Sequence, residues 1–231
     1  MLLITLFLSL LSSCLSEIVK LSEYPYIATL SYGSDRSVCG GAFVSERVFL
    51  TAASCMSGLK LTQVISEMYV ESFPNKYKVQ DLVKHPDFEE DSCDSPDLAL
   101  LYLKKSTIFS IILSIVSLKP NLPIYIGAVS QNAVVSAFYV DSGARHAYKK
   151  DLLTVTSEEG FCDSTDGTFC AKNVHPSNPC VNTFGGPVVN SDKELVGIIP
   201  YDAECTSCHA EQFIRISYYK EWMKKTIKKF T

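Results

Sequence analysis

Short segments rich in Val, Ile, Tyr and Phe, separated by Gly, Pro, Ser and Asp, dominate the chain between residues 26 and 200. Segments of this length and composition, bounded by turn residues, are typical of the strands of an all-β domain. We predict strands at Tyr26–Tyr32, Gly41–Val44, Val48–Ala52, Lys76–Val83, Leu98–Leu103, Val134–Tyr139, Pro187–Val189 and Leu195–Pro200.

Only the C-terminal segment has the apolar periodicity of a helix. Apolar side chains stand at i, i+3, i+4 and i+8 spacing, which predicts a helix over Tyr218–Phe230 capped by Ser217. These side chains are Tyr219, Trp222, Met223 and Ile227. Five lysines crowd the segment Lys220–Lys229. A solvated face at a favourable helix C-terminus explains them, and a polyanion-binding patch is the alternative.

Residues 1–16 carry no charged side chain and contain a mostly apolar run, Leu2–Leu11. A bilayer span needs about 20 apolar residues, so the run is too short for one. It is typical of a secretory signal peptide, for which we expect cleavage after Ser16. No second long apolar run follows, and we therefore expect a soluble, secreted mature protein.

Residues 17–231 then form the mature chain, which is long enough for one all-β unit with a substantial core. The net charge of −4 gives no support for nucleic-acid binding. Nine cysteines occur, and eight remain if Cys14 leaves with the signal peptide. An even number of cysteines in a secreted chain indicates disulfides.

Three segments resemble the catalytic motifs of trypsin-like serine proteases, in the same order along the chain. Thr51–Cys55 resembles Thr-Ala-Ala-His-Cys, with Ser54 at the His position. Asp97–Leu101 resembles Asp-Ile-Ala-Leu-Leu, and Asp97 is kept. The segment 180–187 resembles Cys-x-Gly-Asp-Ser-Gly-Gly-Pro, with Phe184 at the nucleophile position. The resemblance covers about residues 18–230.

This resemblance implies an all-β fold of two antiparallel six-stranded β-barrels followed by a C-terminal helix. The first barrel would span about 18–115, the second about 116–215 and the helix about 217–230. The family's disulfides imply three pairs here: Cys39 with Cys55, Cys162 with Cys170, and Cys180 with Cys205. The pairing of Cys93 and Cys208 remains open.

Trypsin-like catalysis needs a hydroxyl made nucleophilic by an imidazole that a carboxylate orients. Ser54 offers no group with a pKa near neutrality, and Phe184 offers no nucleophile. We expect Asp97 to keep a structural role and to accept hydrogen bonds from Ser54 and nearby backbone N–H groups. Phe184 either fills the vacated cleft as an apolar side chain or is an exposed contact for a partner.

The resemblance places Asn178, Asp202 and Gln212 at the substrate-pocket positions, and their side chains are expected to block the pocket. The Cys205–His209 segment has the spacing of a c-type haem attachment, but the resemblance already assigns Cys205 to a disulfide. The four histidines show no metal-ligand spacing. We therefore expect no cofactor and no metal.

We predict a secreted, non-enzymatic binding protein, because the chain resembles the inactivated serine protease paralogues of the scabies mite. That resemblance implies interference with a host protease cascade such as complement. One alternative is a non-catalytic cofactor or decoy in the organism's own protease network, and another is a hydrolase with a rewired site. We expect a monomer that binds a protein, and neither nucleic acid nor membrane. The surface loops 89–95, 141–150 and 158–168 are candidate contacts.

Overall fold

The computed structural model describes residues 17–18, 23–33, 36–72, 75–90, 92, 95–104, 126–140, 148–157, 162, 164–173, 184–200 and 211–230. The predicted signal peptide and the predicted passage between the two barrels, near residues 110–119, lie outside these ranges.

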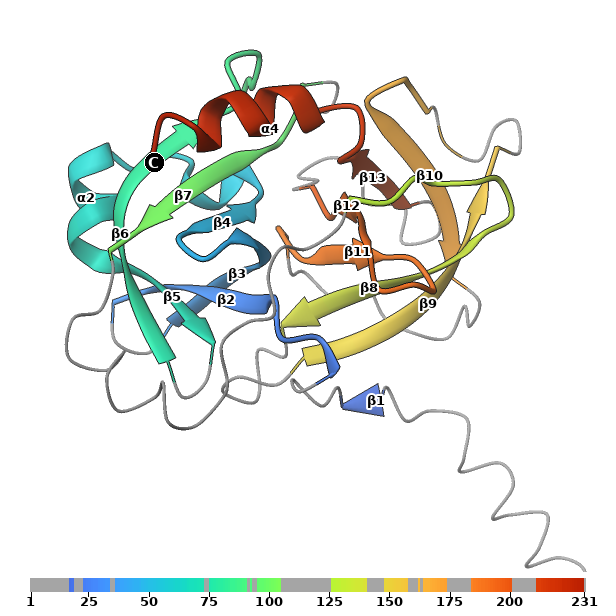
Figure 1. The fold of residues 1–231 in the computed structure, drawn as a ribbon, viewed down its shortest axis with the longest axis horizontal. Helices are drawn as coiled ribbons and strands as arrows, with labels where there is room; N and C mark the ends of the chain where they lie inside the picture. The colour runs from blue at the N-terminus through green and yellow to red at the C-terminus, as the bar shows by residue number, and fades with distance from the viewer. Residues whose placement is uncertain are drawn as a thin grey trace, which may run out of the picture.

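The first half of the chain folds into a closed antiparallel barrel in which the strand order is β2-β3-β4-β7-β6-β5 (Figure 1). Pairing of β2 with β5 closes it. Fully buried Phe43 and Phe49 pack edge to face inside this barrel, with ring centroids 5.6 Å apart. The strands are β2 (Ile27–Tyr32), β3 (Arg36–Ser45), β4 (Val48–Thr51), β5 (Met68–Ser72), β6 (Asn75–Lys84) and β7 (Ala99–Leu103).

The second half forms another closed antiparallel ring, in the order β8-β9-β10-β13-β12-β11, and β1 (Glu17–Ile18) adds to the edge of β9. The buried rings of Phe169 and Phe213 stack in its own core, 5.4 Å apart. The strands are β8 (Val134–Val140), β9 (Tyr148–Thr156), β10 (Thr168–Asn173), β11 (Pro187–Val189), β12 (Leu195–Ile198) and β13 (Glu211–Arg215). The predicted fold of two six-stranded antiparallel barrels with a C-terminal helix is confirmed.

Several elements were not predicted from the apolar pattern. Strands β5, β9, β10 and β13 were missed, because charged and small residues interrupt their alternation. A short helix, α2 (Leu61–Glu67), covers one side of the first barrel (Figure 1). A helix of seven residues shows too little periodicity to be found from sequence, and tertiary packing rather than propensity stabilises it.

The barrels lie side by side (Figure 1), and aromatic residues from the start of the first barrel join them. Tyr24 packs against Phe138 of β8, with ring centroids 4.6 Å apart. The phenol of Tyr26 donates a hydrogen bond of 3.0 Å to the carbonyl of Lys193, in the turn between β11 and β12. These contacts join the two cores at one seam.

Helix α4 (Lys220–Ile227) lies across the top of the molecule and follows the second barrel in sequence (Figure 1). Aromatic rings along α4 and its flanking residues pack on the first barrel. The ring centroids of Tyr219 and Trp222 lie 5.2 Å and 4.8 Å from that of His85. The ring of Phe230 stacks on that of Tyr102, with centroids 4.9 Å apart. The predicted cap is wrong. Tyr219 occupies the N-cap position without a side-chain cap bond, and Ser217 is exposed before it.

The buried position of His85 beneath α4 favours its neutral form. Its side chain is only 9% exposed, and Nδ1 accepts a hydrogen bond of 3.3 Å from the backbone N–H of Asp87. Burial lowers the pKa of His85 below its ordinary 6.5, and the nearby Asp87 carboxylate offsets only part of this. Protonation therefore favours the unfolded chain, because there the imidazole is solvated.

We expect the free energy of unfolding to fall as the pH drops below 6.5, the ordinary pKa of this group. Unfolding in denaturant at about pH 7.5 and about pH 5.5 measures the loss. A His85→Phe variant keeps a ring against Tyr219 and Trp222, so its loss over the same range should be smaller. Equal losses in both proteins would contradict this origin of the pH dependence.

Candidate degenerate active site

Ser54 and Asp97 meet at one end of the first barrel. Ser54 lies in a 3-10 helix, Ala53–Met56, just after β4, and Asp97 lies two residues before β7. Pairing of β4 with β7, which sets Thr51 opposite Ala99, brings them together. The backbone N–H of Ser54 donates to Asp97 Oδ1 at 2.8 Å, and Ser54 Oγ donates to Oδ2 at 2.7 Å.

Asp97 is a buried carboxylate, 5% exposed, and each of its two oxygens accepts a hydrogen bond from Ser54. A buried charge needs such donors, because an unsolvated carboxylate without them is very costly. This arrangement is the structural role expected of Asp97 from the sequence. It stabilises the loop after β4 where the family has an imidazole.

Phe184 lies on the second barrel's side of the seam, three residues before β11. Its side chain is half-buried and packs against the hydrophobic cluster built mainly from the first barrel. Its carbonyl accepts a hydrogen bond of 2.8 Å from the N–H of Gly40 in β3. These contacts show that the ring packs in part against the core. Whether it fills a vacated cleft or is an exposed contact for a partner stays a prediction.

Two glycines after Phe184 make the close approach of the barrels possible. Gly185 has φ +76°, and a Cβ there would collide with Thr51 Oγ1 and the carbonyl of Gly40. A Cβ at Gly186 would collide with the carbonyl of Phe138. Only glycine satisfies both the positive φ and the lack of space at residue 185.

Further hydrogen bonds hold this turn in place. The N–H of Gly185 donates to the carbonyl of Ile199 at 2.7 Å, and the N–H of Ile199 donates to the carbonyl of Gly186 at 2.9 Å. On the first-barrel side of the seam, Thr51 Oγ1 of β4 donates to the carbonyl of Gly40 of β3 at 2.7 Å. Sequence reasoning did not single out Thr51 or Gly40, although both flank the expected Cys39–Cys55 pair.

Within the described ranges, the structure contains two of the expected disulfides. Cys39 joins Cys55, with Cα atoms 6.1 Å apart, and ties β3 to the segment that carries Ser54. Cys162 joins Cys170 at the same Cα separation. The expected Cys180–Cys205 pair lies outside the described residues, as do Cys93 and Cys208.

Of the expected pocket positions, only Gln212 falls within the described ranges. It lies on β13 opposite Cys170, and its amide donates a hydrogen bond of 3.2 Å to Thr168 Oγ1 on β10. Asn178 and Asp202 fall outside those ranges, so their predicted places in the pocket stay predictions.

Chemically, the described site offers a hydrogen-bonded serine–carboxylate pair, and Phe184 at the nucleophile position offers only a phenyl ring. A carboxylate alone is too weak a base to activate an alcohol near neutral pH. In the part of the chain that the structure describes, no group of three or more His, Cys, Asp or Glu side chains could hold a metal ion. Within those same ranges, no helix has the length and apolar character needed to cross a membrane.

Two antiparallel barrels with a C-terminal helix, and a site at the seam between them, define the architecture of the chymotrypsin-like serine proteases. A family model described as Trypsin matches residues 17–223, and the chain belongs to this family.

Relatives support the same assignment. Trypsin 5G1 of Aedes aegypti is 28% identical over 225 residues, which cover 90% of this chain and 82% of that protein. Phenoloxidase-activating factor 1 of Holotrichia diomphalia is 23% identical, with 89% of this chain and 67% of that protein covered.

Solved structures agree on the fold. The scabies mite inactivated protease paralogue S-I1 superposes with a TM-score of 0.70 at 20% identity, covering 93% of this chain and 99% of that one. Kallikrein-related peptidase 10, in complex with Zn²⁺, superposes with a TM-score of 0.69 at 19% identity, and the match covers 91% of this chain and 99% of that one. At these identities the likeness shows the fold alone.

We predict that Ser54→Ala lowers the free energy of unfolding by about 1.5–3 kcal/mol, because it removes a hydrogen bond to a buried carboxylate. Denaturant unfolding measures this. The matched control is Ser217→Ala, which removes an exposed hydroxyl without a cap bond and should change stability by less than about 0.5 kcal/mol. If both variants behaved alike, the Ser54–Asp97 bond would carry no stabilising role.

Proposed function

We propose that this chain is a secreted serine protease homologue without proteolytic activity, and that it acts by binding another protein. One observation carries the proposal. Asp97 accepts hydrogen bonds from both the backbone N–H and the hydroxyl of Ser54, and Phe184 packs against the hydrophobic cluster at the nucleophile position.

Two parts of the catalytic machinery are missing at once. Ser54 cannot serve as a general base, because a hydroxyl has no pKa near neutrality. A phenyl ring cannot attack a carbonyl carbon. Loss of the serine or the histidine of such a triad costs on the order of 10⁶ in turnover, and this chain lacks both.

For the partner we favour a component of a host protease cascade such as complement. Two features support this choice. The apolar segment Leu2–Leu11 and the two disulfides suit an extracellular protein. The fold is also that of a scabies mite paralogue described as inactivated. Asp97 and the seam provide a stable scaffold, on which loops are free to carry contacts.

A second candidate function is a non-catalytic cofactor or decoy in the organism's own protease network. Similarity to the phenoloxidase-activating factors 1 and 3 of Holotrichia diomphalia, at 23% identity each, favours it. A hydrolase with a rewired site is the third candidate. An activity assay separates it from the other two.

We expect no amidase or esterase turnover above the uncatalysed rate with chromogenic peptides of any P1 residue. Trypsin serves as the positive control, and the Phe184→Ala variant as a matched control that should be equally inactive. Turnover by the full chain that an active-site serine reagent abolishes would refute the proposal that the chain is inactive.

Capture from host serum tests the partner. The immobilised protein should retain a defined protease-cascade component, identified by mass spectrometry, and fluid from the producing organism should yield none. The reverse result would favour the cofactor alternative. The segments expected from the sequence to carry the contacts, 89–95, 141–150 and 158–168, lie in part outside the described residues, and residues 148–150 and 168 belong to β9 and β10. Phe184→Ala should leave binding unchanged if these segments carry the contacts, and should weaken it if the seam is the interface.

A further inference from the structure

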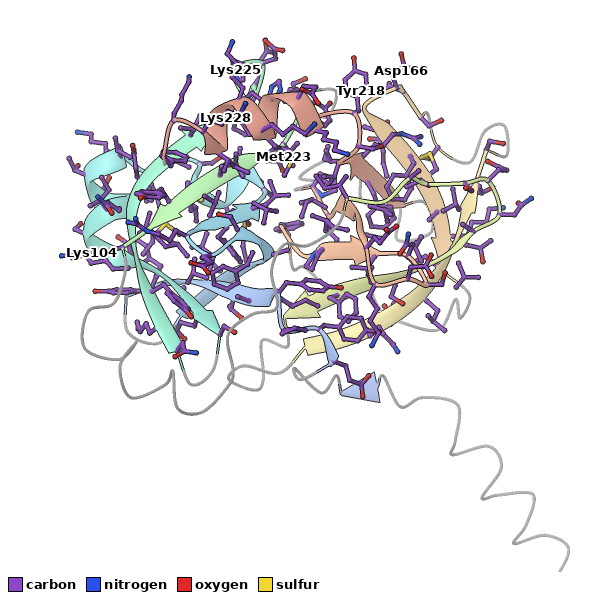
Figure 2. All side chains as sticks on the ribbon, viewed as in Figure 1. Lys104, Asp166, Tyr218, Met223, Lys225 and Lys228 are labelled. Carbon is purple, nitrogen blue, oxygen red and sulfur yellow. A yellow bond between two sulfur atoms is a disulfide. The ribbon has the colours of Figure 1, made fainter. Side chains whose placement is uncertain are left out.

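Helix α4 has two opposite faces, and only one is used for packing. Met223 and Thr226 are buried against the barrels, while all five lysines between residues 220 and 229 are exposed. Figure 2 shows Lys225 and Met223 on opposite sides of the helix, with Met223 toward the barrels. The exposed lysines are Lys220, Lys224, Lys225, Lys228 and Lys229, which we call the basic face.

The basic face concentrates positive charge on an acidic protein. Its five lysines enclose one acid, Glu221, so the segment Lys220–Lys229 carries +4 while the whole chain carries −4. Glu221 is bonded to Lys224 Nζ at 2.8 Å. This hydrogen bond is the main cause that lowers the pKa of Glu221, and the charges of Lys224, Lys220 and Lys228 add to it. A lowered pKa is expected for a carboxylate in a positive local field.

Helix stability does not explain this concentration of charge. The helix dipole favours cations in the last turn, but Lys220 is the first helical residue, where a cation is unfavourable. Three pairs of lysines are also spaced four residues apart, and like charges at that spacing destabilise a helix. These pairs are Lys220 with Lys224, Lys224 with Lys228, and Lys225 with Lys229.

Positive side chains continue beyond the C-terminal end of α4. Phe230 stacks on Tyr102 of β7, and the guanidinium of Arg47 lies 4.3 Å from the centre of the same Tyr102 ring. Next to Tyr102, the Lys104 N–H donates to the carbonyl of Lys78, which sets these two exposed lysines at neighbouring positions. Figure 2 shows Lys104 on the side of the first barrel toward which α4 points.

We propose that the basic face of α4, continued by Arg47 and Lys104, binds a linear sulfated polysaccharide. Lysines along one helix face match an anionic chain, because each ammonium can pair with a sulfate without fixed geometry. A membrane fits less well, because a helix lying in a bilayer inserts its apolar face, and here Met223 and Trp222 turn toward the barrels. This inference is independent of the proposed protein partner.

Surface plasmon resonance with the full chain over immobilised heparin, at about 0.15 M salt, tests the proposal. We expect saturable binding that weakens as salt rises. The double variant Lys225→Glu/Lys229→Glu should raise Kd at least about tenfold, since each cation at an anionic surface contributes on the order of fivefold. Lys225→Arg/Lys229→Arg should keep the affinity.

The matched control is a pair of single charge reversals. Lys225→Glu and Lys193→Glu change the net charge equally, but Lys193 lies on the turn between β11 and β12. Only the first should weaken binding. Lys104→Glu should also weaken binding, and Glu46→Gln, beside Arg47, should strengthen it. Thermal unfolding of each variant checks that the fold is intact.

Three results would overturn the proposal: no binding to heparin, equal weakening by Lys225→Glu and Lys193→Glu, or equal affinity for duplex DNA or for vesicles containing phosphatidylserine. The last result would mean that the basic face responds to any polyanion or to a membrane surface. Failure of this experiment leaves the activity assay and the serum capture unaffected, because neither depends on α4.

Discussion

The rest of the structure depends on the close approach of the turn Phe184–Gly186 to the first barrel. Its backbone bonds to Gly40 of β3 and lies against Thr51 of β4, and neither glycine after Phe184 has space for a side chain. Tyr24 and Phe138 close the seam beside it. The hydrophobic cluster of the first barrel continues into buried residues of the second, such as Phe138 and Val189, because the backbones approach closely at this point.

The same constraint explains how the fold tolerates different side chains at the positions that match the family's catalytic motifs. The hydrogen bonds at the seam join backbone groups of Phe184, Gly185 and Gly186 to their neighbours, so an exchange of the side chain at residue 184 leaves them intact. Ser54 replaces an imidazole and still satisfies the buried Asp97 carboxylate. Phe184 replaces a hydroxyl with a ring that packs inward. Both exchanges keep polar groups paired and apolar surface covered, which stability requires.

Helix α4 packs on the barrels with one face and exposes lysines on the other. Its aromatic face joins the second barrel to His85 and Tyr102 of the first, and its lysines face solvent. Packing explains why Tyr219, Trp222 and Phe230 recur on one side. It does not explain why five cations crowd the other side, where repulsion costs helix stability.

The sequence alone determined the fold class, the C-terminal helix, the order of the three motifs that contain Ser54, Asp97 and Phe184, and the cysteine pairs at residues 39 and 55 and at 162 and 170, because motifs and apolar patterns are local in the chain. It did not reveal strands such as β9, whose charged residues obscure alternation, nor the short helix α2, nor that Tyr219 rather than Ser217 begins α4. Only the tertiary structure decided that Ser54 satisfies both oxygens of Asp97 and that Phe184 lies against Gly40. Those contacts join residues far apart in sequence. The Ser54–Asp97 contact forms when β4 pairs with β7 inside the first barrel, and the Phe184–Gly40 contact forms when the two barrels come together.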